Sequence, residues 1–434
     1  MSEKLSTQPY KGTRDFYPQE MRLRNWFFGV MRRVLETAAF EEYNGPMLES
    51  LELYAAKSGE EIATKQTYNF TDRGDRRLAL RPEMTPTVAR MVAAKMNDLV
   101  FPLKWFSIPN MYRYEAPQRG RLREFWQLNV DIFGCDTYEA DLDCIESAIE
   151  IMRAFGADET MFTVHINNRR FFNDVLAAIT GTDGEGAKAV SKVIDRKGKV
   201  PREAYERDLT ELGLTAEQIS KIDALYGMKV EQACALCPES VGSDELLKLF
   251  AMLKRAGLDR YCVFDFGIIR GLDYYTGTVF EVFDNAPENN RAMFGGGRYD
   301  NLVGLFVKNA KVSGVGYGMG DVTLENFLVT HGLVPDFGSD RVKVLVTRFD
   351  DVPYEAYLKL VEELHGAGIP ATVYLGSKKY GKQLEYAVKG GFTHTLTMGG
   401  DELAKGTVRL KNLATREETE LPAAPEEIGK LLKS

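Results

Sequence analysis

Residues 270–281 read RGLDYYTGTVFE. An arginine leads the stretch, two tyrosines follow side by side, and a β-favouring run ends it. Because successive side chains of a strand point to opposite faces, one of Tyr274 and Tyr275 would pack into the core while the other presents its hydroxyl to a pocket. Arg270 offers a planar fork of donors that suits phosphate or carboxylate. The stretch predicts a strand beside a binding pocket, although a well-packed strand with a surface arginine fits it equally.

Two glycine-rich stretches follow in the sequence. Residues 295–300 read GGGRYD, and three glycines let the backbone approach a neighbour or a ligand closely. They do not form a Walker loop, because no Lys-Ser or Lys-Thr follows. Residues 314–321 read GVGYGMGD, alternate glycines that end a strand before a helix at 322–330. Such a strand lacks side chains on one face, so a flat ligand could lie there, and the helix N-terminus favours an anion. Packing is the commoner reason for glycine in a strand.

A charged hairpin is predicted around a loop at 116–122. Arg113 and Glu115 precede the loop, and Arg121, Phe125 and Gln127 follow it, so that their side chains converge on one face. An arginine beside a glutamate suits a nucleotide, because the cation faces a phosphate while the carboxylate accepts from an adenine amine. A phenylalanine of the right parity could stack on the base. A solvated charged hairpin is the alternative interpretation.

Residues 81–87, RPEMTPT, lie at a predicted strand-to-helix turn. Glu83 and Thr85 could hold an ammonium group there. Alternatively, Thr85 caps the helix and Pro86 takes its first position, and both interpretations can hold together.

The composition describes an ordinary globular chain of two or three domains, with 434 residues, 44% hydrophobic and 27% charged. The net charge of −8 argues mildly against a general nucleic-acid coat. Five cysteines make no disulfide framework, and the N-terminus lacks an apolar signal segment, so we expect a cytoplasmic protein without a membrane span. Cys234 and Cys237 form a lone pair, for which no zinc is expected. The basic run 192–202 is a solvated face or a grip on RNA backbone.

The pattern predicts an α+β catalytic domain at 1–173 and 257–334, with an antiparallel sheet flanked by helices. A helical insertion at 174–256 interrupts it, and an α/β domain follows at 341–434. Helices are predicted at 20–39, 85–96, 138–154 and 322–330, and strands at 103–114, 124–134, 161–167, 262–268, 274–284 and 313–319. In the last domain, strands at 342–348, 370–375 and 392–398 alternate with helices at 353–367, 380–389 and 401–404.

Together these segments resemble the class II aminoacyl-tRNA synthetases, and among them the histidyl-tRNA synthetases, over nearly the whole chain. Residues 11–15, KGTRD, are similar to the family's opening, and the first helix with Pro46 resembles motif 1, which builds the dimer interface in this class. Residues 113–127 resemble motif 2. RGLDYY and GGGRYD are similar to the signatures of the histidine enzymes, and the last domain resembles their anticodon-binding domain.

The resemblance implies that histidine is activated with ATP, through a histidyl-adenylate, and passed to tRNA(His), with release of pyrophosphate and AMP. It implies Mg²⁺ bound with the ATP, no other metal held by the protein, and a homodimer. Arg113 and Arg270 would be the catalytic residues that flank the α-phosphate. The implied ATP-binding residues are Arg113, Glu115, Arg121, Phe125, Arg270 and Asp321. The implied histidine-binding residues are Glu83, Thr85, Gln127, Asp131, Tyr274, Tyr275 and Tyr299.

Two departures from the family's pattern stand out. Motif 3 ordinarily ends with an acidic residue and an arginine for the γ-phosphate, but here Asp321 is followed by no arginine and Thr323 sits near its place. Arg121 or Arg298 could substitute. In the motif 2 loop, Ala116 stands where relatives often carry arginine. We expect Gln118 and Arg119 to contact the tRNA acceptor end and to take over part of the reading of its extra 5′ guanosine.

The main alternative is a non-catalytic, synthetase-like regulatory subunit of histidine biosynthesis. Such relatives usually lack the anticodon domain and lose active-site arginines, whereas this chain keeps both and misses only the motif 3 arginine. A pure RNA-binding module is a third interpretation, but it does not explain paired nucleotide and amino-acid pockets.

Overall fold

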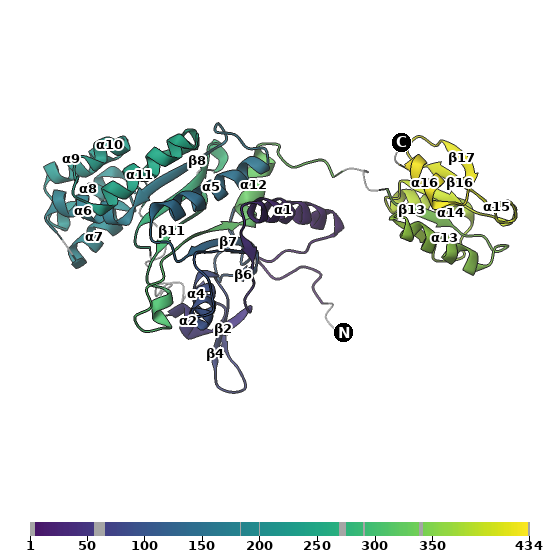
Figure 1. Cartoon of the computed structure of the whole chain (residues 1–434), viewed down its shortest axis with the longest axis horizontal. Helices are drawn as coiled ribbons and strands as arrows, with labels where there is room; N and C mark the ends of the chain where they lie inside the picture. The colour runs from purple at the N-terminus through teal and green to yellow at the C-terminus, as the bar shows by residue number, and fades with distance from the viewer. Residues whose placement is uncertain are drawn as a thin grey trace. The chain divides into compact units, whose positions relative to one another are not determined.

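The computed structural model describes residues 5–55, 66–182, 184–198, 200–268, 275–289, 291–337 and 342–432. The chain forms two compact units, Met1–Val334 and Pro335–Ser434. Arg270 and Tyr274, both predicted site residues, lie outside the described residues. Figure 1 shows the helices and strands of each unit.

The first unit is built on one large sheet. Within the described residues its strands run in the order β1-β5-β7-β12-β11-β10-β8-β9, and β6 pairs with β7. Neighbouring strands are antiparallel except for β1 with β5 and β8 with β9. The predicted antiparallel sheet is confirmed. The strands are β1 Glu41–Glu42, β5 Leu103–Ser107, β6 Asn110–Tyr112, β7 Glu124–Phe133, β8 Phe162–Asn168, β9 Cys262–Phe264, β10 Thr278–Asp284, β11 Ala292–Tyr299 and β12 Gly314–Gly320.

Three sequence predictions differ from these strands. The predicted strand at 103–114 is split into β5 and β6 around Ile108 and Pro109. Strand β11 was not predicted, because its three glycines have low strand propensity and hide the alternation of the others. Tyr275 precedes β10 instead of lying in it, so strand alternation does not decide where its ring points.

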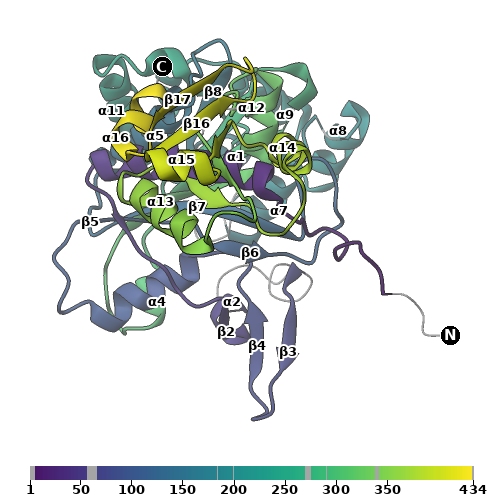
Figure 2. The same ribbon diagram turned by 90° about the vertical axis from the view of Figure 1, so that its right-hand side faces the viewer.

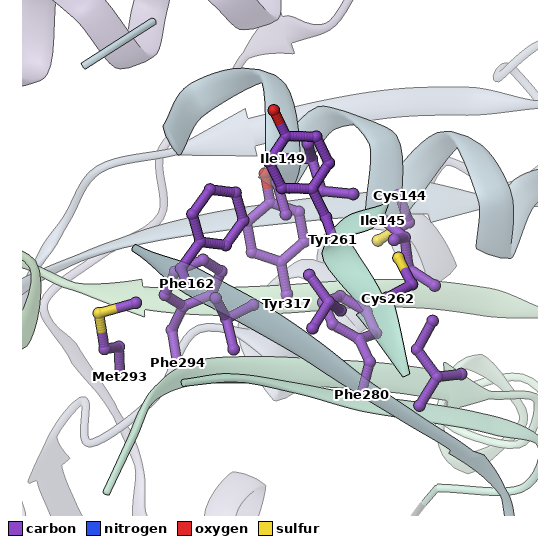
Figure 3. Packing of buried hydrophobic residues seen from close by; sticks show 14 of the residues in the cluster. Cys144, Ile145, Ile149, Phe162, Tyr261, Cys262, Phe280, Met293, Phe294 and Tyr317 are labelled. Carbon is purple, nitrogen blue, oxygen red and sulfur yellow. The ribbon is translucent and has the colours of Figure 1, made fainter. Parts of the chain in front are cut away.

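One face of this sheet is apolar and is covered by helices α1 Pro18–Thr37, α5 Tyr138–Ala154 and α12 Asp321–Thr330. Strand residues alternate between the faces, so that Val130 and Tyr317, which pair across β7 and β12, both point to this core. Figure 3 shows Cys144, Ile145 and Ile149 of α5 above the rings of Phe162, Phe280, Phe294 and Tyr317. Apolar burial on this face therefore fixes which residues point to the other one.

The opposite face carries polar side chains and glycines in register. Asp131 of β7 pairs with Gly316 of β12, and a Cβ on that glycine would lie 2.5 Å from the Asp131 Oδ1. A Cβ on Gly318 would lie 2.7 Å from the Gln127 Nε2. Such distances are closer than real Cβ atoms approach. The glycines thus make room for neighbouring side chains, and the expected bare face for a flat ligand is corrected to a face that these side chains partly cover.

The helical insertion lies against the β8–β9 edge of the sheet (Figure 1). Helix α6 begins at Arg169, before the predicted start of the insertion, because the Asn168 side chain caps it by accepting from the backbone N–H groups of Arg170 and Phe171 at 2.9 and 3.3 Å. Its helices are α6 Arg169–Thr180, α7 Gly184–Ile194, α8 Arg202–Glu211, α9 Ala216–Leu225, α10 Val230–Cys234 and α11 Val241–Arg255.

A small sheet in the order β2-β4-β3 stands apart from the large one. Its β3–β4 hairpin projects from the unit in Figures 1 and 2. The elements here are β2 Leu48–Ser50, α2 Leu51–Ala55, β3 Asn69–Thr71, β4 Arg77–Leu80 and α4 Thr85–Lys95, and short 3₁₀ turns lie at η2 Asp259–Tyr261, η3 Pro287–Asn289 and η4 Val303–Leu305.

The second unit has its own sheet in the order β14-β13-β15-β16-β17. The first three strands are parallel and joined through helices, as the sequence pattern predicted, whereas β16 and β17 are antiparallel additions that it missed. The elements are β13 Val344–Thr347, α13 Tyr354–Gly366, β14 Ala371–Val373, α14 Tyr380–Lys389, β15 His394–Thr397, α15 Gly400–Lys405, β16 Thr407–Asn412, β17 Glu418–Pro422 and α16 Pro425–Leu432. Among the described helices of either unit, none has the length and apolar character that a membrane crossing requires.

Candidate active site

A cavity of about 100 Å³ lies on the polar face of the large sheet. It brings together residues from separate stretches of sequence: Glu83, Thr85, Arg113, Gln127, Asn129, Tyr275, Gly295, Tyr299, Gly316, Tyr317 and Gly318. Five of the seven predicted histidine-binding residues are among them. A larger cavity of about 430 Å³ lies in the insertion, lined by α8 and α9, but it contains none of the predicted site residues. The smaller cavity is therefore the candidate site.

A buried carboxylate lies behind the cavity. Asp131 is 3% exposed, and it accepts hydrogen bonds from the Tyr299 hydroxyl and, at 3.5 Å, from the Tyr43 hydroxyl. Burial raises the pKa of Asp131 to about 7, since a charge is poorly solvated there. A carboxyl group between two phenols can accept from an N–H donor that enters the cavity.

The turn that carries Glu83 and Thr85 is fixed by Arg81. This arginine is 4% exposed, and it donates from Nε to the Asn110 carbonyl at 2.9 Å and from Nη1 to the Gly45 carbonyl at 2.7 Å. Helix α4 begins at Thr85, with Met84 in the cap position and no capping side chain, so the expectation that Thr85 caps the helix is wrong. The Thr85 side chain instead lines the cavity.

The predicted hairpin forms between β6 and β7, and Arg113 lies at its base beside the cavity. The Arg113 Nε donates to the Pro82 carbonyl at 2.9 Å, and its guanidinium carbon lies 5.2 Å from the centre of the Phe125 ring. Beyond it, the Arg121 side chain is 58% exposed and lies 3.5 Å from the Glu115 carboxylate. The hairpin thus presents two cations, a carboxylate and an aromatic ring next to the cavity.

Arg123 braces this hairpin, and the sequence reasoning missed it. Its Nε donates to the Glu115 carbonyl at 3.0 Å, and its Nη1 donates to the Tyr10 hydroxyl at 2.7 Å. The Gly12 carbonyl accepts from the backbone N–H groups of Arg123 and Glu124 at 2.9 and 3.1 Å. The N-terminal KGTRD stretch, noted in the sequence, therefore holds the strand that carries Phe125 and Gln127.

Comparison with known proteins agrees with this geometry. A family model described as histidyl-tRNA synthetase matches residues 12–321, and an anticodon-binding domain model matches residues 342–433. The chain belongs to the histidyl-tRNA synthetase family.

Curated relatives support this membership over nearly the whole chain. The histidine–tRNA ligase of Leptospira biflexa is 47% identical over 418 residues, 95% of each chain, and that of Opitutus terrae is 38% identical over 96% of each. The solved histidyl-tRNA synthetase of Nostoc sp. PCC 7120 has a TM-score of 0.82, 26% identity and 99% coverage of both chains. A Bacillus halodurans structure titled as a regulatory subunit or synthetase, at 22% identity and TM-score 0.75, shows the shared fold alone.

The acidic residue of motif 3 is tied to protein groups in this family member. Asp321 is 4% exposed and accepts from Arg14 at 2.7 Å, from Arg24 at 3.0 Å and from the Trp126 backbone N–H at 3.0 Å. The Arg24 guanidinium lies 3.9 Å from the Trp126 ring, and burial lowers its pKa. Asp321 thus joins α12, α1 and β7, while its predicted contact with ATP stays a prediction.

The place of the missing motif 3 arginine is filled without a cation. The Thr323 hydroxyl donates to the Met293 carbonyl at 2.7 Å. Arg298 does not substitute, which corrects one expectation: it is 2% exposed and donates to Asp141 at 3.0 Å and to the Cys135 and Thr137 carbonyls at 2.9 and 2.8 Å. Arg121 remains the exposed alternative.

The motif 2 loop is held at two points. Gln118 and Arg121 exchange backbone hydrogen bonds of 3.0 and 2.9 Å, and Arg119 donates to the Asn289 Oδ1 at 3.0 Å. The side chain of Gln118 is exposed. Within the described ranges, no three His, Cys, Asp or Glu side chains lie close enough to hold a metal ion, and Cys234 and Cys237 are free thiols.

Asp131→Asn is expected to stabilise the protein more at pH 8 than at pH 5. Because the pKa of Asp131 is raised, the folded chain keeps a proton that the unfolded chain has lost between roughly pH 4 and 7, so wild-type stability falls as pH rises through this range. Asparagine removes this loss, because its Oδ1 accepts from one tyrosine while its Nδ2 donates to the hydroxyl oxygen of the other. Melting temperatures of the two proteins between pH 5 and 8 measure the difference, and the exposed Asp98→Asn serves as control. A gain that does not change with pH would contradict the buried ionisation.

Proposed function

We propose that this chain attaches L-histidine to tRNA(His) in two steps, with ATP as the energy source. The observation that carries the proposal is the single cavity that unites Glu83, Thr85, Gln127, Tyr275 and Tyr299 next to Arg113. Family membership supports the same activity, because the matched relatives are named histidine–tRNA ligases.

In the first step, a histidine carboxylate oxygen attacks the α-phosphorus of ATP, and the bond to the bridging oxygen breaks to release pyrophosphate. Such a displacement mainly needs positioning and charge stabilisation. Arg113 supplies donors at the cavity edge, and we assign Arg270 the opposite side on the family resemblance. Phe125 and Glu115 hold the adenine, and Arg121 holds the distal phosphates. Asp321 contributes by fixing the start of α12 and strand β7.

Histidine selection is assigned to the back of the cavity. Asp131 accepts from one imidazole nitrogen, and the hydroxyl of Tyr275, which lines the cavity, contacts the other nitrogen. Tyr274 is assigned to histidine binding from the family resemblance alone. Glu83, Thr85 and Gln127 hold the amino group, and Tyr299 fixes the Asp131 carboxyl. Apolar amino acids of similar shape would leave these buried groups unpaired, which disfavours them strongly.

In the second step, a hydroxyl of the terminal tRNA ribose attacks the carbonyl carbon of the histidyl-adenylate, and AMP leaves. Magnesium would be held chiefly by the ATP phosphates and would neutralise their charge. The residues fit that arrangement, because the hairpin offers arginines for phosphate, and Glu124 already accepts from Asn110 and Tyr112 while Glu115 lies beside Arg121. We also propose that the enzyme acts in the cytoplasm and that it binds no zinc.

A regulatory, non-catalytic role is not favoured. Residues 342–433 match an anticodon-binding domain model, and the sequence keeps arginine at positions 113, 121 and 270. The relatives matched at 47% and 38% identity are named as ligases.

Histidine-dependent ATP–pyrophosphate exchange tests the proposal. The purified chain should exchange labelled pyrophosphate into ATP with histidine and not with the other amino acids. Absence of exchange, with histidine binding still detected by calorimetry, would point to the regulatory alternative.

In the same assay Arg121→Ala should raise the KM for ATP by about tenfold, which corresponds to the loss of roughly one charge-assisted contact. Arg207→Ala, an arginine of similar exposure in α8, should leave it unchanged.

Gln118 is proposed to contact the acceptor end of tRNA. Gln118→Ala should reduce the preference for tRNA(His) with the extra 5′ guanosine over tRNA without it, while pyrophosphate exchange stays at the wild-type rate. Aminoacylation of the two transcripts measures the preference. An unchanged ratio would remove Gln118 from this role.

The homodimer is proposed to include the outer face of the small sheet. Leu48 pairs with Leu80, and Phe70 pairs with Leu78, so these four side chains share one face, and Leu48 and Phe70 are 45% and 46% exposed. The other face of the sheet packs Ala79 against Tyr54. An apolar face of this kind is typical of an interface between subunits.

Phe70→Asp is expected to weaken dimerisation, because burying a charged aspartate in an apolar interface costs its hydration free energy. Sedimentation velocity across a concentration series should show more monomer than for wild type. Val100→Asp, at an 84% exposed position outside this face, is the control and should behave as wild type. Equal dimer content in all three proteins would exclude this face from the interface.

A further inference from the structure

A chain of polar contacts runs from the helical insertion to the wall of the candidate histidine pocket. It consists of Glu245 in α11, Arg170 in α6, Asp300 after β11 and Thr276 before β10. We call these four residues the insertion tether. Arg170 forms an ion pair with Glu245 through Nη1 and lies 3.1 Å from the Asp300 Oδ2 through Nη2. The Thr276 hydroxyl donates to the same Asp300 oxygen at 2.6 Å.

The inner end of the tether is fixed from both sides. The Thr276 backbone N–H donates to the Arg298 carbonyl at 2.7 Å, and the Gly277 carbonyl accepts from the Arg169 N–H at 2.8 Å. Arg298 is itself immobilised by Asp141. Tyr275, which lines the cavity, is the residue directly before Thr276. Any shift of Thr276 therefore moves the attachment point of the Tyr275 ring.

The outer end of the tether is equally well anchored. Glu245 accepts from the Asn168 Nδ2 at 2.7 Å, and the Asn168 Oδ1 caps α6. Helix α11 approaches this cap so closely that a Cβ on Gly242 would lie 2.8 Å from the Asn168 Oδ1. Two helix ends of the insertion are thus locked together at the point from which Arg170 reaches Asp300.

We propose that Arg170 and Asp300 are positioning residues for histidine binding, through which the helical insertion holds the Tyr275 wall of the pocket. Neither side chain lines the cavity, so their effect is transmitted through Thr276. Arg170 suits this role because its planar fork serves two carboxylates at once. This inference rests on the proposed function, since it concerns the same pocket.

The test compares Arg170→Ala, Thr276→Val and the double variant in pyrophosphate exchange. Each single variant should raise the KM for histidine by about five- to tenfold, with the KM for ATP within about twofold of wild type. The double variant should be no worse than the worse single variant, because both break one chain of contacts. Arg170→Lys, which keeps the charge but loses the fork, should fall between wild type and Arg170→Ala.

Arg196→Ala is the matched control, since Arg196 forms a 3.0 Å ion pair with Asp208 in the insertion and is not one of the four residues of the tether. It should leave both KM values unchanged. An unchanged KM for histidine in Arg170→Ala and Thr276→Val, equal rises in both KM values, or strictly additive effects would overturn the tether. Wild-type exchange is measured first: if it is absent, the proposed adenylation fails, and histidine calorimetry on the same variants still decides the tether.

Discussion

The polar face of the large sheet depends on one steric constraint. Strand β12 carries glycine where side chains of the neighbouring strands cross it, at Gly316 beside Asp131 and at Gly318 beside Gln127. Any larger residue would clash with these two polar groups, of which Gln127 lines the cavity and Asp131 lies behind it. The apolar opposite face, held under α1, α5 and α12, keeps the register that makes this arrangement possible. Apolar burial on one face and the β12 glycines on the other thus act together to place these polar groups.

Buried charges then connect this sheet to its surroundings. Asp321 accepts from Arg14 and Arg24 and so connects the N-terminal region to the large sheet. Arg298 of β11 donates to Asp141 of α5. Burial alone would lower the pKa of Arg298, but the ion pair with Asp141 and the nearby carboxylates of Asp300 and Glu245 together raise that pKa. Removing one partner of such a pair leaves an uncompensated charge, which is strongly destabilising. These contacts link elements far apart in sequence and hold the edges of the cavity.

The sequence predicted the helices well, because their apolar residues recur at helical spacing. Family motifs in the sequence identified most of the predicted histidine-binding residues that line the cavity. It missed β11 because glycines conceal strand alternation, and it missed β16 and β17 in the second unit. Arg81, Arg123 and Asp300 escaped it for another reason. Each acts through a partner that is distant in sequence, and a single arginine or aspartate in a motif does not reveal that partner. Arg298 was misjudged for the same reason, since only the fold shows that Asp141 neutralises it.

The central claim is that the cavity between Asp131 and Arg113 binds the histidine that becomes activated. A crystal structure with ATP and histidinol, an alcohol that lacks the attacking carboxylate, tests it most directly. Histidinol should bind with its imidazole toward Asp131, its amino group near Glu83 and Gln127, and its hydroxyl facing the α-phosphate beside Arg113. Histidinol bound elsewhere, or with its imidazole turned away from Asp131 toward solvent, would show that this cavity is not the histidine site.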